Sequence, residues 1–306
     1  MAHTIAFLGT GIMGAPMAAN LINAGFKAAV WNRTRSKTDP LAALGARVAE
    51  GPGDCVDGAD YILSILDSGP VVREVFFESK AADAIKPRAI FIDMASIPPQ
   101  MAKEHAAWLK ERGVGHLDAP VSGGSRGAAE GSLAIMAGGE RSDFDRTEKD
   151  GIWKAMGRAS YIGPAGSGQI AKLANQIMVA CNIASVAQGL LFAAAGGADP
   201  AQIPFALAGG HADSRALQEH GQRMIKRDFR PGAPIRNFVK DLDTVLATAN
   251  QIGLPQLSIV KKVRDVFKDL YDQGYERWDH SAFLLYLEKL NAPKRLGDKA
   301  DTPPAS

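Results

Sequence analysis

The 306-residue sequence has few of the residues that build disulfide scaffolds or metal sites. It contains only two cysteines, Cys55 and Cys181, which lie far apart and form no CxxC or Cys/His ligand spacing. We therefore expect reduced interior thiols in a cytoplasmic protein, without a disulfide framework. The six histidines form no i, i+4 pair and no HExxH motif, so we expect no metal site. His280 is the one histidine that we would inspect as a possible neighbour of an active site.

The sequence also lacks a block of charge of one sign. Thirty-five Lys and Arg residues oppose 33 Asp and Glu residues, which gives a net charge of +2 and no basic stripe for a nucleic acid. The amino terminus MAHTIAFLGTGIMG has no cationic region before its short apolar run, so we expect no secretory leader. The long apolar stretch 173–195 is interrupted by five polar residues, which favours a buried helix over a membrane span.

The chain length is about twice the roughly 150 residues of one domain. Up to residue 162, short apolar runs alternate with helix-like stretches, a pattern typical of parallel strands joined by crossover helices. The predicted strands are 5–9, 28–32, 61–66, 89–93, 116–121, 133–138 and 159–163. After residue 168 only helical segments follow, namely 167–195, 201–209, 235–251, 256–273 and 280–290. We expect domains at 1–164 and 165–295, and a flexible tail at 296–306.

A glycine motif follows the first predicted strand. Gly9, Gly11 and Gly14 form GxGxxG between the apolar run 5–8 and a helix-compatible segment. The first glycine permits a tight turn, the second lets a pyrophosphate approach the backbone, and the third allows close packing of helix on strand. The helix N-terminus would then face the phosphates. This context predicts a dinucleotide-binding, doubly wound Rossmann domain rather than a glycine-rich turn without a ligand.

The end of the second strand bears on the choice of cofactor. An Asp or Glu there usually holds the ribose hydroxyls of NAD, whereas this chain has Asn32-Arg33-Thr34 followed by Arg35. Arg33 can bind a 2′-phosphate through a forked, charge-assisted hydrogen bond, and Asn32 and Thr34 can add polar contacts. We therefore expect NADP(H) to be preferred, with NAD(H) still open. The alternative is that both arginines are solvated loop charges.

The long helix carries a polar face near its start. Lys172, Asn175 and Gln176 are spaced i, i+3, i+4 among apolar residues, so they share one face. A ligand pocket would give them polar partners, and the lysine could donate a proton to a carbonyl oxygen or accept one from a hydroxyl. The alternative is a lysine that snorkels to solvent.

A second candidate element is Ser122-Gly123-Gly124, which follows the strand predicted at 116–121. Its small residues let successive backbone N–H groups converge on an anion such as a substrate carboxylate. A plain glycine turn to the next helix is the competing interpretation.

Together these motifs resemble the β-hydroxyacid dehydrogenase family over roughly residues 3–292. The matching segments are FLGTGIMGAPMAANL (7–21), DAPVSGGSRGAAEGSLAIMAGG (118–139), GSGQIAKLANQ (166–176) and KDL (240–242). The resemblance implies an amino-terminal Rossmann domain, an all-helical second domain and a homodimer or homotetramer. It assigns Lys172 as the acid/base, and Ser122, Gly123, Gly124, Asn175 and Gln176 to the substrate. It also places Ile12, Met13, Leu66, Ser96 and Lys240 at the cofactor.

The resemblance also narrows the activity. Gln176 and the segments 229–232 and 279–282 look most like tartronate semialdehyde (2-hydroxy-3-oxopropionate) reductases, whereas the Asn-Arg-Thr strand end looks more like the NADPH-dependent aldehyde reductases. Many members read D-x-S-S or D-x-S-T in the segment that is Asp93-Met94-Ala95-Ser96 here, so this chain lacks one hydroxyl-bearing side chain near the cofactor. We expect reversible reduction of a small carboxylated aldehyde or ketone. Alternatives are a 3-hydroxyisobutyrate or sugar-acid dehydrogenase, a succinic semialdehyde or glyoxylate reductase, and a non-catalytic NADP-binding module. The lysine argues against imine reduction.

Overall fold

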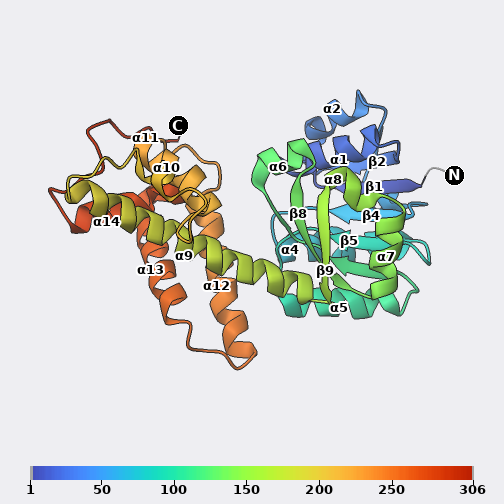
Figure 1. The fold of residues 1–306 in the computed structure, drawn as a ribbon. Coiled ribbons are helices and arrows are strands. Elements are labelled where there is room, and N and C mark those ends of the chain that lie inside the picture. Colours follow the sequence, from blue (N-terminus) through green and yellow to red (C-terminus); the bar gives the residue numbers. More distant parts are fainter. Residues whose placement is uncertain (1–2, 305–306) are drawn as a thin grey trace. The chain divides into compact units, whose positions relative to one another are not determined.

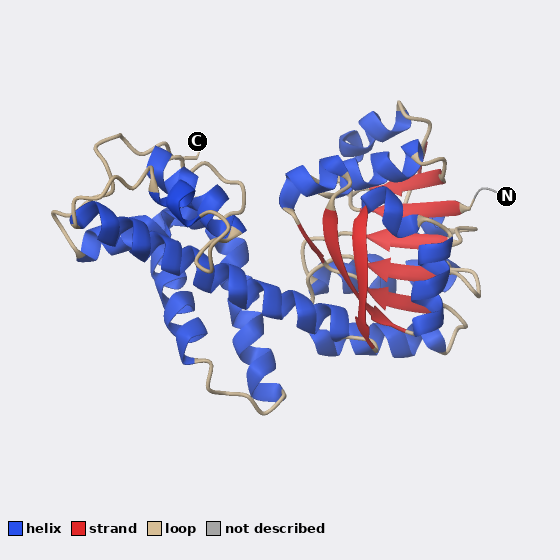
Figure 2. Cartoon of the chain, viewed as in Figure 1, coloured by secondary structure: helices blue, strands red, loops and turns tan. Residues whose placement is uncertain are grey.

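The computed structural model describes residues 3–304 and divides the chain into two compact units. The first unit ends at Lys172 and the second begins at Leu173, a few residues beyond the boundary expected at residue 164. Strands belong to the first unit, and the second is helical (Figures 1 and 2). The chain therefore has the predicted class, a sheet with flanking helices followed by a helical domain.

The sheet of the first unit, drawn red in Figure 2, is mostly parallel. Its strands are ordered β3-β2-β1-β4-β5-β6-β8-β7, and β9 pairs with β8. Its order reverses between β1 and β4, and in such sheets a ligand site lies beyond the carboxyl ends of the strands at this point. The strands are β1 (Thr4–Leu8), β2 (Lys27–Trp31), β3 (Arg47–Val48), β4 (Tyr61–Ser64), β5 (Ile90–Asp93), β6 (Gly115–Asp118), β7 (Val121–Ser122), β8 (Leu133–Gly139) and β9 (Gly157–Gly163).

Helices cover both faces of this sheet. Ile5 and Phe7 belong to one buried apolar cluster, while Ala6 and Leu8 belong to another, because alternate residues of a strand point to opposite faces. Burial on both faces explains why the strand sequences are continuously apolar. The helices of this unit are α1 (Gly14–Asn23), η1 (Arg35–Thr38), α2 (Asp39–Ala42), α3 (Pro52–Val56), α4 (Gly69–Val72), η2 (Arg73–Glu78), η3 (Ala81–Ala84), α5 (Pro99–Lys110), α6 (Gly124–Glu130), α7 (Arg141–Lys149) and α8 (Ile152–Met156).

The strand predicted at 116–121 divides in two. β6 ends at Asp118, and β7 begins at Val121 after Ala119 and Pro120. A proline has no N–H group for a sheet ladder, although the Pro120 carbonyl still accepts a hydrogen bond from the Met136 amide. β8 runs antiparallel to both β6 and β7, whereas the pairs from β3 to β6 in the sheet order are parallel, as the sequence pattern predicts.

The second unit is built around α9, which begins in the first unit and contributes seven residues to the core of the second. These are Leu173, Ala180, Ile183, Ala184, Ala187, Leu190 and Leu191. By length and composition alone α9 could cross a membrane, but its buried face belongs to this core. The helices are α9 (Ser167–Ala195), α10 (Ile203–Leu207), η4 (Leu217–Gly221), α11 (Gln222–Lys226), α12 (Ile235–Gln251), α13 (Ser258–Leu270), η5 (Tyr271–Tyr275), η6 (His280–Ala282) and α14 (Phe283–Leu290).

The segment after α14, most of which we expect from its composition to be a flexible tail, makes specific contacts in the structure, and its flexibility stays a prediction. The Arg227 side chain is only 1% exposed and binds both carboxylate oxygens of Glu288, at 2.7 and 2.8 Å. Arg227 also pairs with Asp301, and the Thr302 amide donates to the Arg227 carbonyl. A buried guanidinium requires such partners. The polar composition of the tail did not indicate these contacts, because their partner, Arg227, lies some 70 positions earlier in the chain.

Candidate active site

The glycine turn after β1 has the geometry that its motif predicts. Gly9 has φ +97°, and a Cβ there would lie 2.4 Å from the Ile65 carbonyl oxygen. A Cβ on Gly14 would lie 1.8 Å from the Gly9 carbonyl oxygen, so α1 can pack against β1 only with glycine. A Cβ on Gly11 would meet no atom within 4 Å, and Ile12 is exposed. Open space therefore adjoins the backbone where α1 begins, as a pyrophosphate requires.

Asn32 connects this turn to the end of β2. Its Oδ1 atom accepts a hydrogen bond from the Thr10 amide at 3.1 Å, and its Nδ2 atom donates to the Thr34 carbonyl at 3.0 Å. An aspartate could keep the first bond but could not donate the second. In the structure the Asn32 side chain orders two loops, and a direct contact to the cofactor stays a prediction.

A small pocket of about 110 Å³ lies at the same end of β2. Arg33 and Arg35 line it, and Glu50 faces them, with its Oε1 atom 3.7 Å from Nη1 of Arg35. The other lining residues are Trp31, Asn32, Thr38, Val48 and Ala49. Two guanidinium groups and one carboxylate give the pocket a net positive charge, which suits a phosphate group.

Lys172 lies beside the Ser-Gly-Gly turn. Its Nζ atom donates a hydrogen bond to the Val121 carbonyl at 2.8 Å, and Val121 directly precedes Ser122. Gly123 and Gly124 both have positive φ, at +136° and +61°, so the turn depends on residues without a Cβ. The structure thus brings the candidate lysine to the candidate carboxylate turn, although the two segments are about fifty positions apart in sequence.

Asn175 and Gln176 belong to a hydrogen-bonded chain in the second unit. Asn175 Nδ2 donates to Gln176 Oε1 at 2.8 Å, and Gln176 Nε2 donates to Asp241 Oδ2 at 2.6 Å. Lys240 Nζ lies 3.6 Å from the other oxygen of Asp241. The structure therefore brings α9 and α12 together through these side chains. Asp241 was not among the predicted site residues, although it stands in the matched segment 240–242.

Leu66 and Ser96 follow the next two strands of the sheet, β4 and β5. Leu66 approaches the glycine turn so closely that its Cδ2 atom would lie 2.9 Å from a Cβ on Gly9. Ser96 is partly exposed and stands between two residues, Ala95 and Ile97, whose backbone groups are hydrogen-bonded to Gln169. Both predicted cofactor residues thus lie beyond the carboxyl ends of parallel strands.

Two buried carboxyl groups, Asp93 and Asp118, stand opposite each other at the ends of β5 and β6. Burial raises the pKa of Asp93 to about 7, and the charge of Asp118 raises it further. Hydrogen bonds from the Ala95 amide and the Ser64 hydroxyl lower this pKa but do not outweigh burial. Burial also raises the pKa of Asp118 to about 7, although the Gly166 and Gln169 amides donate to it at 2.7 and 2.9 Å. Sequence reasoning did not single out either carboxyl group.

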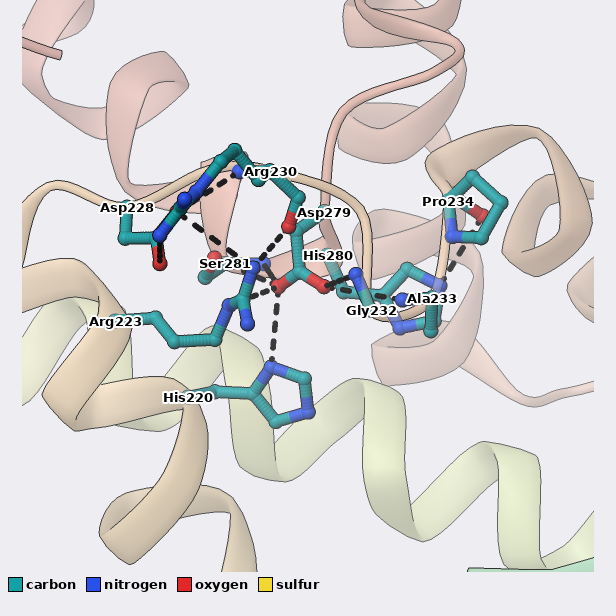
Figure 3. A network of polar contacts seen from close by, with 10 residues as sticks. All are labelled: His220, Arg223, Asp228, Arg230, Gly232, Ala233, Pro234, Asp279, His280 and Ser281. Atoms are coloured by element: carbon teal, nitrogen blue, oxygen red, sulfur yellow. Dashed lines mark hydrogen bonds and ion pairs between the residues drawn. The ribbon is translucent and has the colours of Figure 1, made fainter. Parts of the chain in front are cut away.

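The histidine proposed for inspection belongs to a polar network in the second unit (Figure 3). Asp279 is 1% exposed and accepts hydrogen bonds from the Gly232, Ala233 and Ser281 amides. Burial opposes ionisation of Asp279, yet His220, whose Nδ1 atom lies 3.4 Å from Asp279 Oδ1, and the nearby His280 hold its pKa below the usual value. His280 stacks on Phe238 with ring centroids 4.0 Å apart. The network fixes the loop that leads into α12.

Comparison with known proteins gives the family. A family model described as the NAD binding domain of 6-phosphogluconate dehydrogenase matches residues 4–163. A second, described as NAD-binding of NADP-dependent 3-hydroxyisobutyrate dehydrogenase, matches residues 166–287. The chain is 40% identical to the 2-hydroxy-3-oxopropionate reductase of Escherichia coli over 286 residues, which cover 93% of this chain and 97% of that protein.

Further relatives agree with this result. An NAD-dependent L-serine dehydrogenase of Pseudomonas aeruginosa is 31% identical over 90% of this chain and 95% of its own length. The structure of a Mycobacterium tuberculosis 3-hydroxyisobutyrate dehydrogenase with L-serine superposes with a TM-score of 0.85 at 29% identity, covering 94% of this chain and 99% of that one. The chain belongs to the β-hydroxyacid dehydrogenase family, whose members are NAD(P)-dependent oxidoreductases.

The raised pKa of Asp93 predicts a pH-dependent stability difference. Between about pH 4 and 7 the folded state keeps a proton that an unfolded Asp has lost, so the contribution of Asp93 to stability falls as pH rises through this window. Asp93→Asn removes this titration while keeping an acceptor for the Ala95 amide. Its free energy of unfolding relative to the unsubstituted protein should rise by on the order of 1–3 kcal/mol between pH 5 and 8.

Urea denaturation at several pH values measures this difference. The matched control is Asp145→Asn, because Asp145 is exposed on α7 and should give a nearly constant difference. A difference for Asp93→Asn that stays flat from pH 5 to 8 would contradict the assignment.

Proposed function

We propose that this chain is an NADP(H)-dependent reductase of a small carboxylated aldehyde or ketone, with an activity like that of 2-hydroxy-3-oxopropionate reductase and reversible as a hydroxyacid dehydrogenase. The observation that carries the proposal is the contact between Lys172 Nζ and the Val121 carbonyl, which places an ammonium group beside Ser122-Gly123-Gly124. A proton donor and a small-residue turn for a carboxylate are what reduction of an oxo-acid requires. The Escherichia coli relative supports this substrate class.

The residues present fit a bound NADP(H). The open backbone at Gly11 and the positive end of α1 suit the pyrophosphate, and the pocket with Arg33 suits the 2′-phosphate. Leu66, Ser96 and Lys240 would hold the remainder of the cofactor, beside Ile12 and Met13. When bound, the nicotinamide supplies the hydride that reduces the carbonyl carbon.

The protein's own groups orient the substrate and move the proton. Ser122, Gly123 and Gly124 hold the carboxylate and thereby direct the carbonyl carbon toward the hydride donor. Lys172 Nζ stabilises the negative charge that develops on the carbonyl oxygen and donates a proton to it. In the reverse direction the amine accepts the hydroxyl proton. Asn175, held by Gln176 and Asp241, supplies a further polar contact to the substrate.

Alternative substrates lie within the same chemistry. A 3-hydroxyisobutyrate or sugar-acid dehydrogenase, or a succinic semialdehyde or glyoxylate reductase, would use the same lysine and turn. A non-catalytic NADP-binding module would need neither, so the contact between them argues against it. The homodimer or homotetramer and the cytoplasmic location expected from the sequence remain predictions.

Replacement of the lysine tests the proposed chemistry. Lys172→Met should lower kcat for tartronate semialdehyde reduction by about 10²- to 10⁴-fold, because no other group would deliver the proton. The dissociation constant for NADPH, measured by fluorescence titration, should change little. Lys154→Met is the matched control, since Lys154 is exposed on α8. Turnover by Lys172→Met equal to that of this control would reject the assignment.

Replacement of the arginine tests the cofactor preference. Arg33→Asp should change the ratio of kcat/KM for NADPH to that for NADH by about 10²-fold or more toward NADH, because a carboxylate repels the 2′-phosphate and accepts from ribose hydroxyls. Arg158→Asp makes the same charge change at an exposed position on β9 and should leave the ratio unchanged. A ratio in Arg33→Asp that matches this control would overturn the proposed 2′-phosphate site.

A further inference from the structure

Gln169, in the first turn of α9, has a buried side-chain amide whose donor and acceptor are both used. The residue is 1% exposed. Its Nε2 atom donates to the Ala95 carbonyl at 2.8 Å, and its Oε1 atom accepts from the Ile97 amide at 3.1 Å. These two bonds lie on either side of Ser96 in the sequence, so one side chain fixes the backbone of the loop both before and after that residue.

The start of α9 is attached to the sheet at two further strand ends. The backbone amides of Gly166 and Gln169 donate to the two carboxylate oxygens of Asp118. One turn later, Lys172 Nζ donates to the Val121 carbonyl. Because Gln169 and Lys172 are three residues apart on one helix, the loop that carries Ser96 and the proposed proton donor are attached to a single rigid element.

In the part of the chain that the structure describes, few other side chains form hydrogen bonds with the backbone of the loop that carries Ser96. Ala95 carries no hydroxyl group. Within residues 3–304, the Ala95 amide donates to the Asp93 side chain and the Ile97 amide donates to the Gln169 side chain. Without the Gln169 amide, the Ala95 carbonyl and the Ile97 N–H would lose their partners in a buried environment. Unpaired buried groups are unfavourable, so the loop would move to satisfy them.

We propose that Gln169 is a positioning residue for the reduction: it keeps the loop with Ser96 in register with Lys172, so that the nicotinamide and the proton donor meet the same carbonyl group. The inference rests on the proposed function. Gln169 acts through Ser96 and the helix backbone and does not itself touch the reacting atoms. A displacement of about 1 Å between reacting groups is enough to lower a rate about 10²-fold.

Two substitutions separate positioning from packing. Gln169→Leu keeps most of the volume but loses both hydrogen bonds, and we expect kcat to fall about 10- to 100-fold with a larger primary isotope effect from NADPH deuterated at C4. Gln169→Glu keeps the acceptor, and its carboxylic acid form can also donate to the Ala95 carbonyl. Its kcat relative to the unsubstituted enzyme should therefore recover as pH falls, which a merely structural role does not predict.

A measurement without cofactor tests the loop directly. Hydrogen exchange of the segment around Ile97 should be faster in Gln169→Leu than in the unsubstituted protein. Gln188→Leu is the matched control, because Gln188 is exposed on the same helix, and it should alter neither exchange nor kcat.

The outcomes distinguish this inference from the proposed function. If the unsubstituted enzyme reduces no semialdehyde, the proposed function fails and takes the inference with it. If that enzyme is active while Gln169→Leu matches Gln188→Leu in kcat and exchange, only the role of Gln169 is overturned. A lower kcat in Gln169→Glu that does not recover at acidic pH would also contradict it.

Discussion

The candidate site depends on one buried carboxylate at the start of a helix. The first N–H groups of α9 have no partners within the helix, and Asp118 accepts the Gln169 amide in the first turn and the Gly166 amide just before the helix. The fit is close, because a Cβ on Gly138 would lie 2.7 Å from the Gly168 amide nitrogen, and a Cβ on Gly168 would lie 2.3 Å from the Asp118 carbonyl oxygen. Only glycines let the helix backbone approach the strand ends this closely.

This junction explains how distant segments of sequence form one site. Once the first turn of α9 is fixed to β6, Gln169 reaches the loop after β5 and Lys172 reaches the residue before Ser122. The glycine turn lies after β1 in the same sheet, where Gly9 and Gly14 allow α1 to begin, and β4 separates β1 from β5. Buried polar groups at these strand ends hold the segments of the candidate site in place. Because Asp118 is one of these buried groups, its pKa is raised to about 7.

Local sequence patterns predicted most strands and helices, because burial of a strand or the need for glycine in a turn depends on residues that are neighbours in sequence. Continuous apolar runs predicted the buried strands, and the spacing of Gly9, Gly11 and Gly14 predicted the tight turn between β1 and α1. Long-range pairing was not predictable in this way. The reversed direction of β8 and the contacts of Arg227 with the tail depend on partners distant in sequence. The helical residues 217–226 were also not predicted. Gln169 was missed although it stands in the matched segment 166–176, since a glutamine gives no sign of its partners.

The most direct test of the proposed reduction is to trace hydride transfer from the cofactor to the substrate. Tartronate semialdehyde should be incubated with the enzyme and NADPH deuterated at C4, and the product examined by NMR, with succinic and methylmalonate semialdehydes as alternative acceptors. The account predicts that deuterium from the enzyme-specific face of the nicotinamide appears on the carbinol carbon of at least one hydroxyacid product. Cofactor binding without transfer of label to any of these carboxylated acceptors would contradict it.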